Sequence, residues 1–148
     1  MIRVALGQVN GWDTRNTVMQ TLDRCDSQLD GTRPDAGILF VNSDMDHDMV
    51  MQTIVSRYPG IELVGCTSGG EFSTDLGASD DSVSLMLFQS DEVTFAAGAG
   101  QHLKSDPARA IEEAIREASR KLSAPPKMCL VFAEPFEHSY GPIVQLLN

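Results

Sequence analysis

The sequence predicts a single α/β domain with a mixed, largely parallel sheet, helices on both faces and an antiparallel hairpin. Its length of 148 residues suits one compact domain over residues 1–148. Continuous apolar runs at residues 37–41 and 61–65 are typical of strands that are covered on both faces, as in parallel sheets. Helical patterns separate the strands, and this alternation implies parallel neighbours joined by right-handed crossovers.

The first strand is predicted at residues 2–6, a short apolar segment that residues 7–11 bring to an end. A helix then begins near Asp13 or Thr14, since either side chain can cap its first turn. Apolar residues at helical spacing give this helix one buried stripe, made of Val18, Leu22, Cys25 and Leu29. The helix is expected to end at Asp30-Gly31, because glycine readily adopts the left-handed conformation of a helix terminus.

The strand at 37–41 leads into a second helix and then a third strand. Val50 and Ile54 are expected to face inward from this helix, which ends before Tyr58-Pro59-Gly60 because proline disfavours helix at the residue preceding it. The third strand, at 61–65, is predicted to end in a loop of small residues.

The second half of the chain predicts a hairpin, a helix and another strand. Apolar runs at 82–88 and 92–97 flank a short turn and form the hairpin. Asp106-Pro107 is a strong helix start, since proline fits the first helical position. A strand follows at 128–133, and a last helix begins near residue 141. No helix stop precedes the end of the chain, so we expect it to be the N-terminal part of a longer protein.

The charge balance argues against two classes of partner. The chain carries 21 acidic and 11 basic residues, for a net charge of -10. Nucleic acids and anionic membrane surfaces both require clustered Lys and Arg, so neither is expected to bind. Three cysteines without CxxC spacing favour neither a disulfide scaffold nor a zinc site. With no signal peptide and no apolar run near the roughly 20 residues of a membrane helix, a cytoplasmic location follows.

A ligand site is predicted where the apolar strands end, because ligands of open α/β sheets bind outside the carboxyl ends of the strands. Small or polar residues follow three of the predicted strands there, and they are the candidate ligand-binding residues: Asn42, Ser43, Cys66, Thr67, Ser68, Gly69, Gly70, Glu71 and Glu134. Glycines permit close approach of the backbone, and exposed N–H groups hold anions such as carboxylates. The alternative is a tight turn whose hydroxyls satisfy local backbone groups.

Catalytic and metal motifs are weak throughout. Cys66 as a nucleophile would need a nearby base, but none of the three histidines has a diagnostic spacing. Asp44, Asp46 and Asp48 imitate the start of a calcium loop, which fails where glycine and glutamate are required, so helix capping explains them better. We therefore predict no metal, no resident cofactor and no enzymatic activity.

The run Gly65-Cys66-Thr67-Ser68-Gly69-Gly70-Glu71-Phe72 resembles the FIST N-terminal domain, a sensory domain of F-box and intracellular signal-transduction proteins. That family has a strand ending in Gly-Cys-Thr-x-x-Gly-Glu. The apolar strand that ends at Asn42-Ser43 resembles the one preceding it, and residues 82–88 and 128–133 resemble later strands. The resemblance is best over residues 35–97.

This resemblance implies a small-ligand-binding sensory domain in intracellular signal transduction, coupled to a signalling protein partner, with amino acids among the ligands. Family members often carry a second, C-terminal FIST domain. Some members resemble haem-based gas sensors, and the histidines permit haem without matching a haem motif. Three alternatives stay open: a haem sensor, a Cys-dependent enzyme and a scaffold for protein partners.

Overall fold

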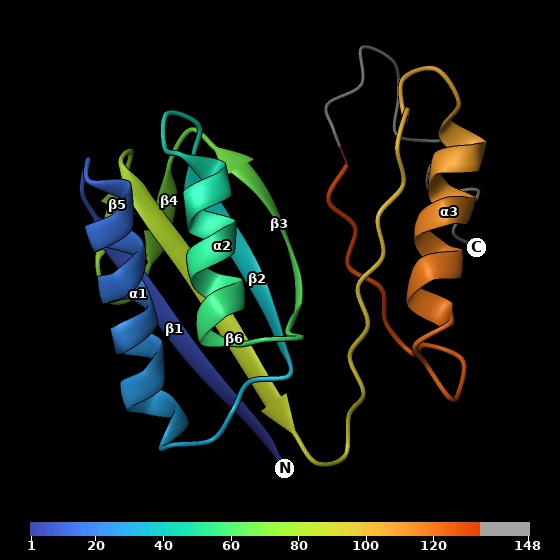
Figure 1. Cartoon of the computed structure of the whole chain (residues 1–148), viewed down its shortest axis with the longest axis horizontal. Helices are drawn as coiled ribbons and strands as arrows, with labels where there is room; N and C mark the ends of the chain where they lie inside the picture. The colour runs from blue at the N-terminus through green and yellow to red at the C-terminus, as the bar shows by residue number, and fades with distance from the viewer. Residues whose placement is uncertain (134–148) are drawn as a thin grey trace. The chain divides into compact units, whose positions relative to one another are not determined.

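The computed structural model describes residues 1–133, so Glu134 and the predicted last helix lie outside the described residues. Figure 1 shows the elements in chain order, which are β1 (Ile2–Asn10), α1 (Thr14–Leu29), β2 (Ala36–Asn42), α2 (His47–Arg57), β3 (Glu62–Ser68), β4 (Glu71–Ser73), β5 (Gly77–Ser79), β6 (Ser82–Ser90) and α3 (Pro107–Ser119). The chain forms two compact units, Met1–Thr94 and the part from Phe95 onward.

The first unit is built on a sheet with the strand order β1-β6-β2-β3. Strand β6 runs antiparallel to both of its neighbours, while β2 and β3 are parallel. The α/β class and the mixed sheet are therefore confirmed. Two of the three strand pairs are antiparallel, so parallel pairing is less extensive than predicted, because β6 lies between β1 and β2.

Helices α1 and α2 contact each other and lie on the same face of this sheet (Figure 1). The sequence predicts helices on both faces, whereas the first unit has both of its helices on one. The predicted stripe on α1 is confirmed, since all four residues are buried, as are Val50 and Ile54 of α2. Buried residues of β6 and β2 complete the core: Val83, Leu85, Leu87, Leu39 and Val41.

Strand β1 continues through Gly7 to Asn10, so the predicted break at residues 7–11 is wrong. A Cβ atom at Gly7 would lie 2.4 Å from the backbone oxygen of Thr21. Gly7 therefore permits close approach of α1 to the strand. The predicted ends of α1 are confirmed, because Asp13 accepts a hydrogen bond from Asn16 N–H at 3.1 Å and Asp30 has a left-handed φ of 53°.

The antiparallel hairpin lies elsewhere than predicted. Strand β6 continues through residues 89 and 90, which were expected to turn, and residues 92–97 are not a strand. The hairpin pairs β4 with β5, between the predicted third strand and the strand predicted from residue 82. Gly77 has a φ of +76°, which glycine adopts without strain at the return of this hairpin.

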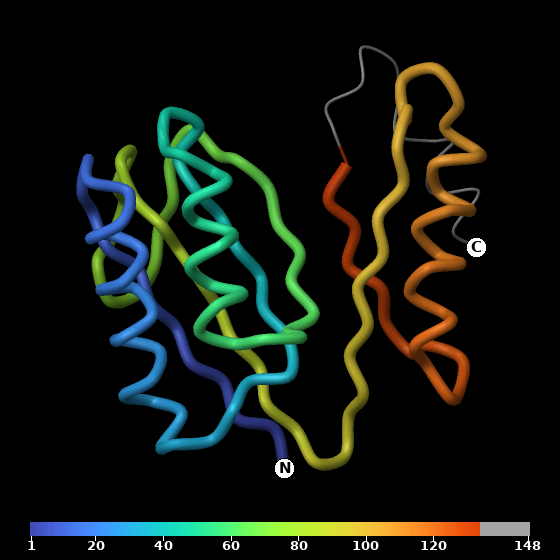
Figure 2. Tube along the Cα trace, viewed as in Figure 1, coloured from blue at the N-terminus to red at the C-terminus, as the bar shows by residue number. Residues whose placement is uncertain are grey.

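The second unit contains α3, which begins after the predicted cap Asp106. Figure 2 follows the extended chain that precedes this helix. A Cβ atom at Gly98 would lie 2.1 Å from the Ala114 backbone oxygen, so this chain lies directly against α3. Residues 128–133 are not a strand, and the prediction there is wrong.

Candidate functional site

The carboxyl ends of β2 and β3 lie side by side, because the two parallel strands pair in register up to Asn42 and Ser68. Cys66, Thr67 and Ser68 are the last residues of β3, so the prediction that they form a loop is wrong. Only Gly69 and Gly70 separate β3 from β4. Glu134, the third expected contributor, lies outside the described residues.

Gly65 and Gly69 differ in what surrounds them. A Cβ atom at Gly65 would lie 1.8 Å from the Leu39 backbone oxygen, so glycine is required where β3 pairs with β2. A Cβ atom at Gly69 would meet no atom within 4 Å. Neither Gly69 nor Gly70 has a positive φ. The backbone at Gly69 therefore borders open space.

Glu71 is the centre of the site. It is the first residue of β4 and is only 6% exposed. Its carboxylate accepts hydrogen bonds from the hydroxyls of Ser68 and Ser82, one on each oxygen. A buried carboxylate needs such donors because it has lost its contact with water.

Gln8 extends this network to β1. Its side-chain Nε2 donates to Ser82 Oγ at 3.2 Å. The Ser82 hydroxyl has one hydrogen, which it donates to Glu71, so Gln8 must direct its NH₂ group at Ser82. The other amide atom, Gln8 Oε1, is buried and has no hydrogen-bond partner among the described residues.

The network lies on the face of the sheet opposite the helices. Side chains alternate along a strand, and Gly7 faces α1, so Gln8 points to the other face. Sequence reasoning named Glu71 as a candidate ligand-binding residue but missed Gln8 and Ser82. The available signal was a glutamine between Gly7 and Val9 in an otherwise apolar strand.

Asn42 and its neighbours brace the end of β2. The Asn42 amide donates to the Asp80 carbonyl oxygen and accepts from Asp44 N–H at 2.7 Å. His47 Nε2 lies 3.2 Å from the Asn42 carbonyl oxygen. Ser43 is exposed. Asn42 thus holds the loop that follows β2 and the turn that precedes β6.

The cysteines differ in their surroundings. Cys66 and Cys129 are exposed, and within residues 1–133 no histidine is hydrogen-bonded to Cys66. Cys25 is fully buried, and burial raises the pKa of its thiol to about 12, with the charge of Asp26 as a smaller cause. A thiol with a raised pKa is a poor nucleophile. In the part of the chain that the structure describes, no group of His, Cys, Asp and Glu side chains is arranged to hold a metal ion.

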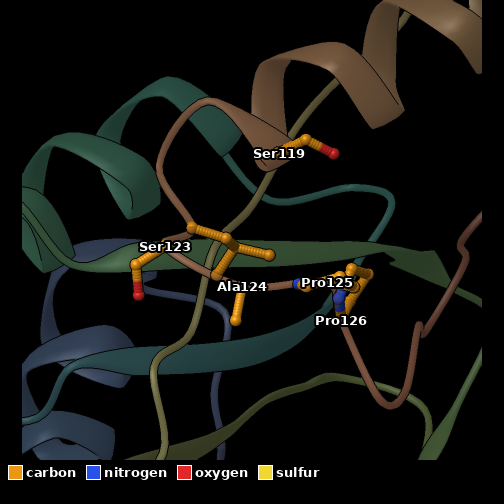
Figure 3. Close-up of a pocket in the computed structure, with 6 residues that line it drawn as sticks. Ser119, Ser123, Ala124, Pro125 and Pro126 are labelled. Carbon is orange, nitrogen blue, oxygen red and sulfur yellow. The ribbon is translucent and has the colours of Figure 1, made fainter.

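A separate hollow lies in the second unit beyond the end of α3. It is lined by Ser119, Leu122, Ser123, Ala124, Pro125 and Pro126. The side chains of Ser119 and Ser123 point in different directions in Figure 3. Because its polar groups do not converge, this hollow is not a candidate site.

These features define an α/β domain with a buried polar network at the ends of two parallel strands. The chain matches the model of the FIST N domain over residues 35–148, and it belongs to this family. FIST N domains are sensory domains of signal transduction rather than catalytic domains. The family resemblance of the Gly-Cys-Thr run is thereby confirmed.

The family match begins at Asp35, so β1, α1 and Gln8 lie outside it. No curated protein matches the chain. Among the described helices, none has the length and apolar character needed to span a membrane.

Proposed function

We propose that this sensory domain binds a small ligand at the rim where β2 and β3 end. Ser68, Gly69, Gly70 and Glu71 form its centre. The observation that carries the proposal is the buried Glu71 carboxylate two residues after Gly69, where an added Cβ atom would meet no atom within 4 Å.

The surroundings of this centre support the proposal. Cys66 and Thr67 are exposed along the end of β3, and Asn42 and Ser43 flank it at the end of β2. The carboxyl ends of parallel strands are the usual ligand-binding edge of an α/β sheet. Ligand occupancy is read by a signalling partner.

A thermal-shift screen of metabolites tests the proposal. A ligand that binds only the folded protein must raise the midpoint of unfolding, Tm. Gly69→Leu is the matched blocking variant, because a Cβ atom there meets no atom within 4 Å, so the substitution should leave the fold intact. Thr74→Leu, in the exposed turn of the β4–β5 hairpin, is the control.

We expect the hits to raise Tm of the wild type and of Thr74→Leu but not of Gly69→Leu. A broad screen that leaves Tm unchanged would contradict ligand sensing, and hits that stabilise all three proteins equally would place the site elsewhere. We propose that no haem is involved, and a Soret band after reconstitution with haem would contradict this.

A further inference from the structure

We propose that Glu71 and Gln8 together recognise a primary ammonium group of the ligand. The inference rests on the proposed function and names the ligand class that this site takes. Two independent observations carry it, one at Glu71 and one at Gln8.

The first observation is that Glu71 is buried and forms no ion pair with a cation within residues 1–133. Buried carboxylates are normally paired with a positive charge, because removing the charge from water is costly. Among the described residues, the cations of Arg57, Arg109 and the N-terminus pair with other carboxylates, and none of them pairs with Glu71. Two serine hydroxyls are the hydrogen-bond donors to Glu71, one per oxygen. Each carboxylate oxygen accepts about two hydrogen bonds, so both retain acceptor capacity.

The second observation is the unpartnered carbonyl oxygen of Gln8. Gln8 is 1% exposed, and its Oε1 atom has no donor among the residues that the structure describes. An unmet buried acceptor is rare in folded proteins and calls for an explanation such as an absent bound group. Gln8 and Glu71 are joined through the same hydroxyl, that of Ser82. The unmet acceptor and the unpaired charge therefore belong to one network.

The chemistry of the ligand group follows from the charge of Glu71 and the acceptor of Gln8 that remain unmet. The hydroxyl hydrogens of Ser68 and Ser82 are both donated to Glu71, so the groups that the network leaves unmet are the charge of Glu71 and the acceptor Gln8 Oε1. An ammonium group has three N–H donors, no acceptor and a positive charge. It can satisfy Glu71 and Gln8 together, whereas a water molecule would leave the charge of Glu71 unpaired. A carboxylate would place like charges next to each other.

The net charge of the chain supports the same ligand class. With a formal charge of -10, the protein attracts cations over long range and repels anions. The segment from Cys66 to Asp81, which includes Gly69 and Glu71, contains no basic residue that would repel a cation.

The test compares two probes that differ in one group. L-alaninamide carries an ammonium group where L-lactamide carries a hydroxyl. Each is titrated into the ¹⁵N-labelled full chain near pH 7, and amide shifts in β3 and β4 are followed by NMR. We expect L-alaninamide to move the amides of residues 68–71 and to bind at least about tenfold more tightly than L-lactamide.

Two variants assign this preference to residues. Glu71→Gln removes the charge with little change in shape, and Gln8→Leu removes the unmet oxygen from a strand that tolerates apolar residues. Either variant should weaken L-alaninamide about tenfold or more and so remove most of its preference over L-lactamide. If Glu71→Gln fails to fold, Gln8→Leu still decides the matter.

Failure of this inference is distinguishable from failure of the proposed function. Equal binding of the two probes, the absence of any shift at residues 68–71, or retention of the preference in Gln8→Leu would overturn ammonium recognition. Neutral or anionic hits from the metabolite screen that are lost in Gly69→Leu would still uphold ligand sensing at this rim.

Discussion

The buried thiol of Cys25 is expected to make the first unit sensitive to alkaline pH. Cys25 lies on the inner face of α1, with its sulfur 3.6 Å from the Leu85 carbonyl oxygen. Burial raises the pKa of this thiol to about 12. The folded protein therefore holds the proton at pH values where the unfolded chain has released it.

The sign and size of the effect follow from this shift. A group whose pKa is raised on folding contributes stability below its unfolded pKa, near 9.0 for this thiol, and loses that contribution as the pH rises towards 12. The loss is about 1.4 kcal/mol per pH unit in this window. At about pH 10.5 the free energy of unfolding should have fallen by about 2 kcal/mol because of Cys25.

Urea unfolding followed by circular dichroism, from about pH 8 to about pH 10.5, measures this loss. Cys25→Ala is less stable at neutral pH because it leaves a small cavity, but its stability should fall less steeply with pH. Burial and the Asp26 carboxylate also raise the pKa of Tyr58, and this contribution persists in the variant. Cys66→Ala, which removes an exposed thiol, is the control and should retain the wild-type slope. Parallel pH profiles for the wild type and Cys25→Ala would refute the reasoning.

Two further predictions concern packing and helix contact. Gly65→Ala should lower the free energy of unfolding by about 1–3 kcal/mol, because its Cβ would lie 1.8 Å from the Leu39 backbone oxygen, whereas Gly69→Ala should change it by less than about 0.5 kcal/mol. Equal urea midpoints for the two variants would contradict this close approach. Tyr58→Phe should cost about 1 kcal/mol in the same assay, because it removes the 2.6 Å hydrogen bond to Asp26 that joins α2 to α1. A variant as stable as the wild type would show that this bond makes no net contribution.

The elements that the sequence predicts well are those whose pattern is local. The buried stripe of α1 and its cap at Asp13 depend on residues within a few turns, and both are confirmed. The pairing of β6 is different, since a short turn after residue 88 favours a local hairpin. In the structure β6 pairs with β1 and β2, far earlier in the chain. Non-local pairing of this kind leaves no mark on the spacing of residues near the strand.

The candidate site likewise has one part that could be predicted from the sequence and one part that could not. Its place at the ends of β2 and β3 could be predicted from the two apolar runs, and the register of Asn42 and Ser68 agrees with that placement. The network around Glu71 could not be predicted, because the bond between Gln8 and Ser82 joins residues 74 positions apart. Any of the chain's 21 acidic residues offers the same carboxylate.

The position of β6 inside the sheet has a consequence for how the protein forms during synthesis. Both hydrogen-bonding neighbours of this strand, β1 and β2, are synthesised well before residue 82 is added. Until then β1 has no partner strand, and its exposed backbone groups are open to pairing with other chains. A nascent chain stopped before β6 should therefore aggregate, while one extended past residue 90 has every strand of the four-stranded sheet.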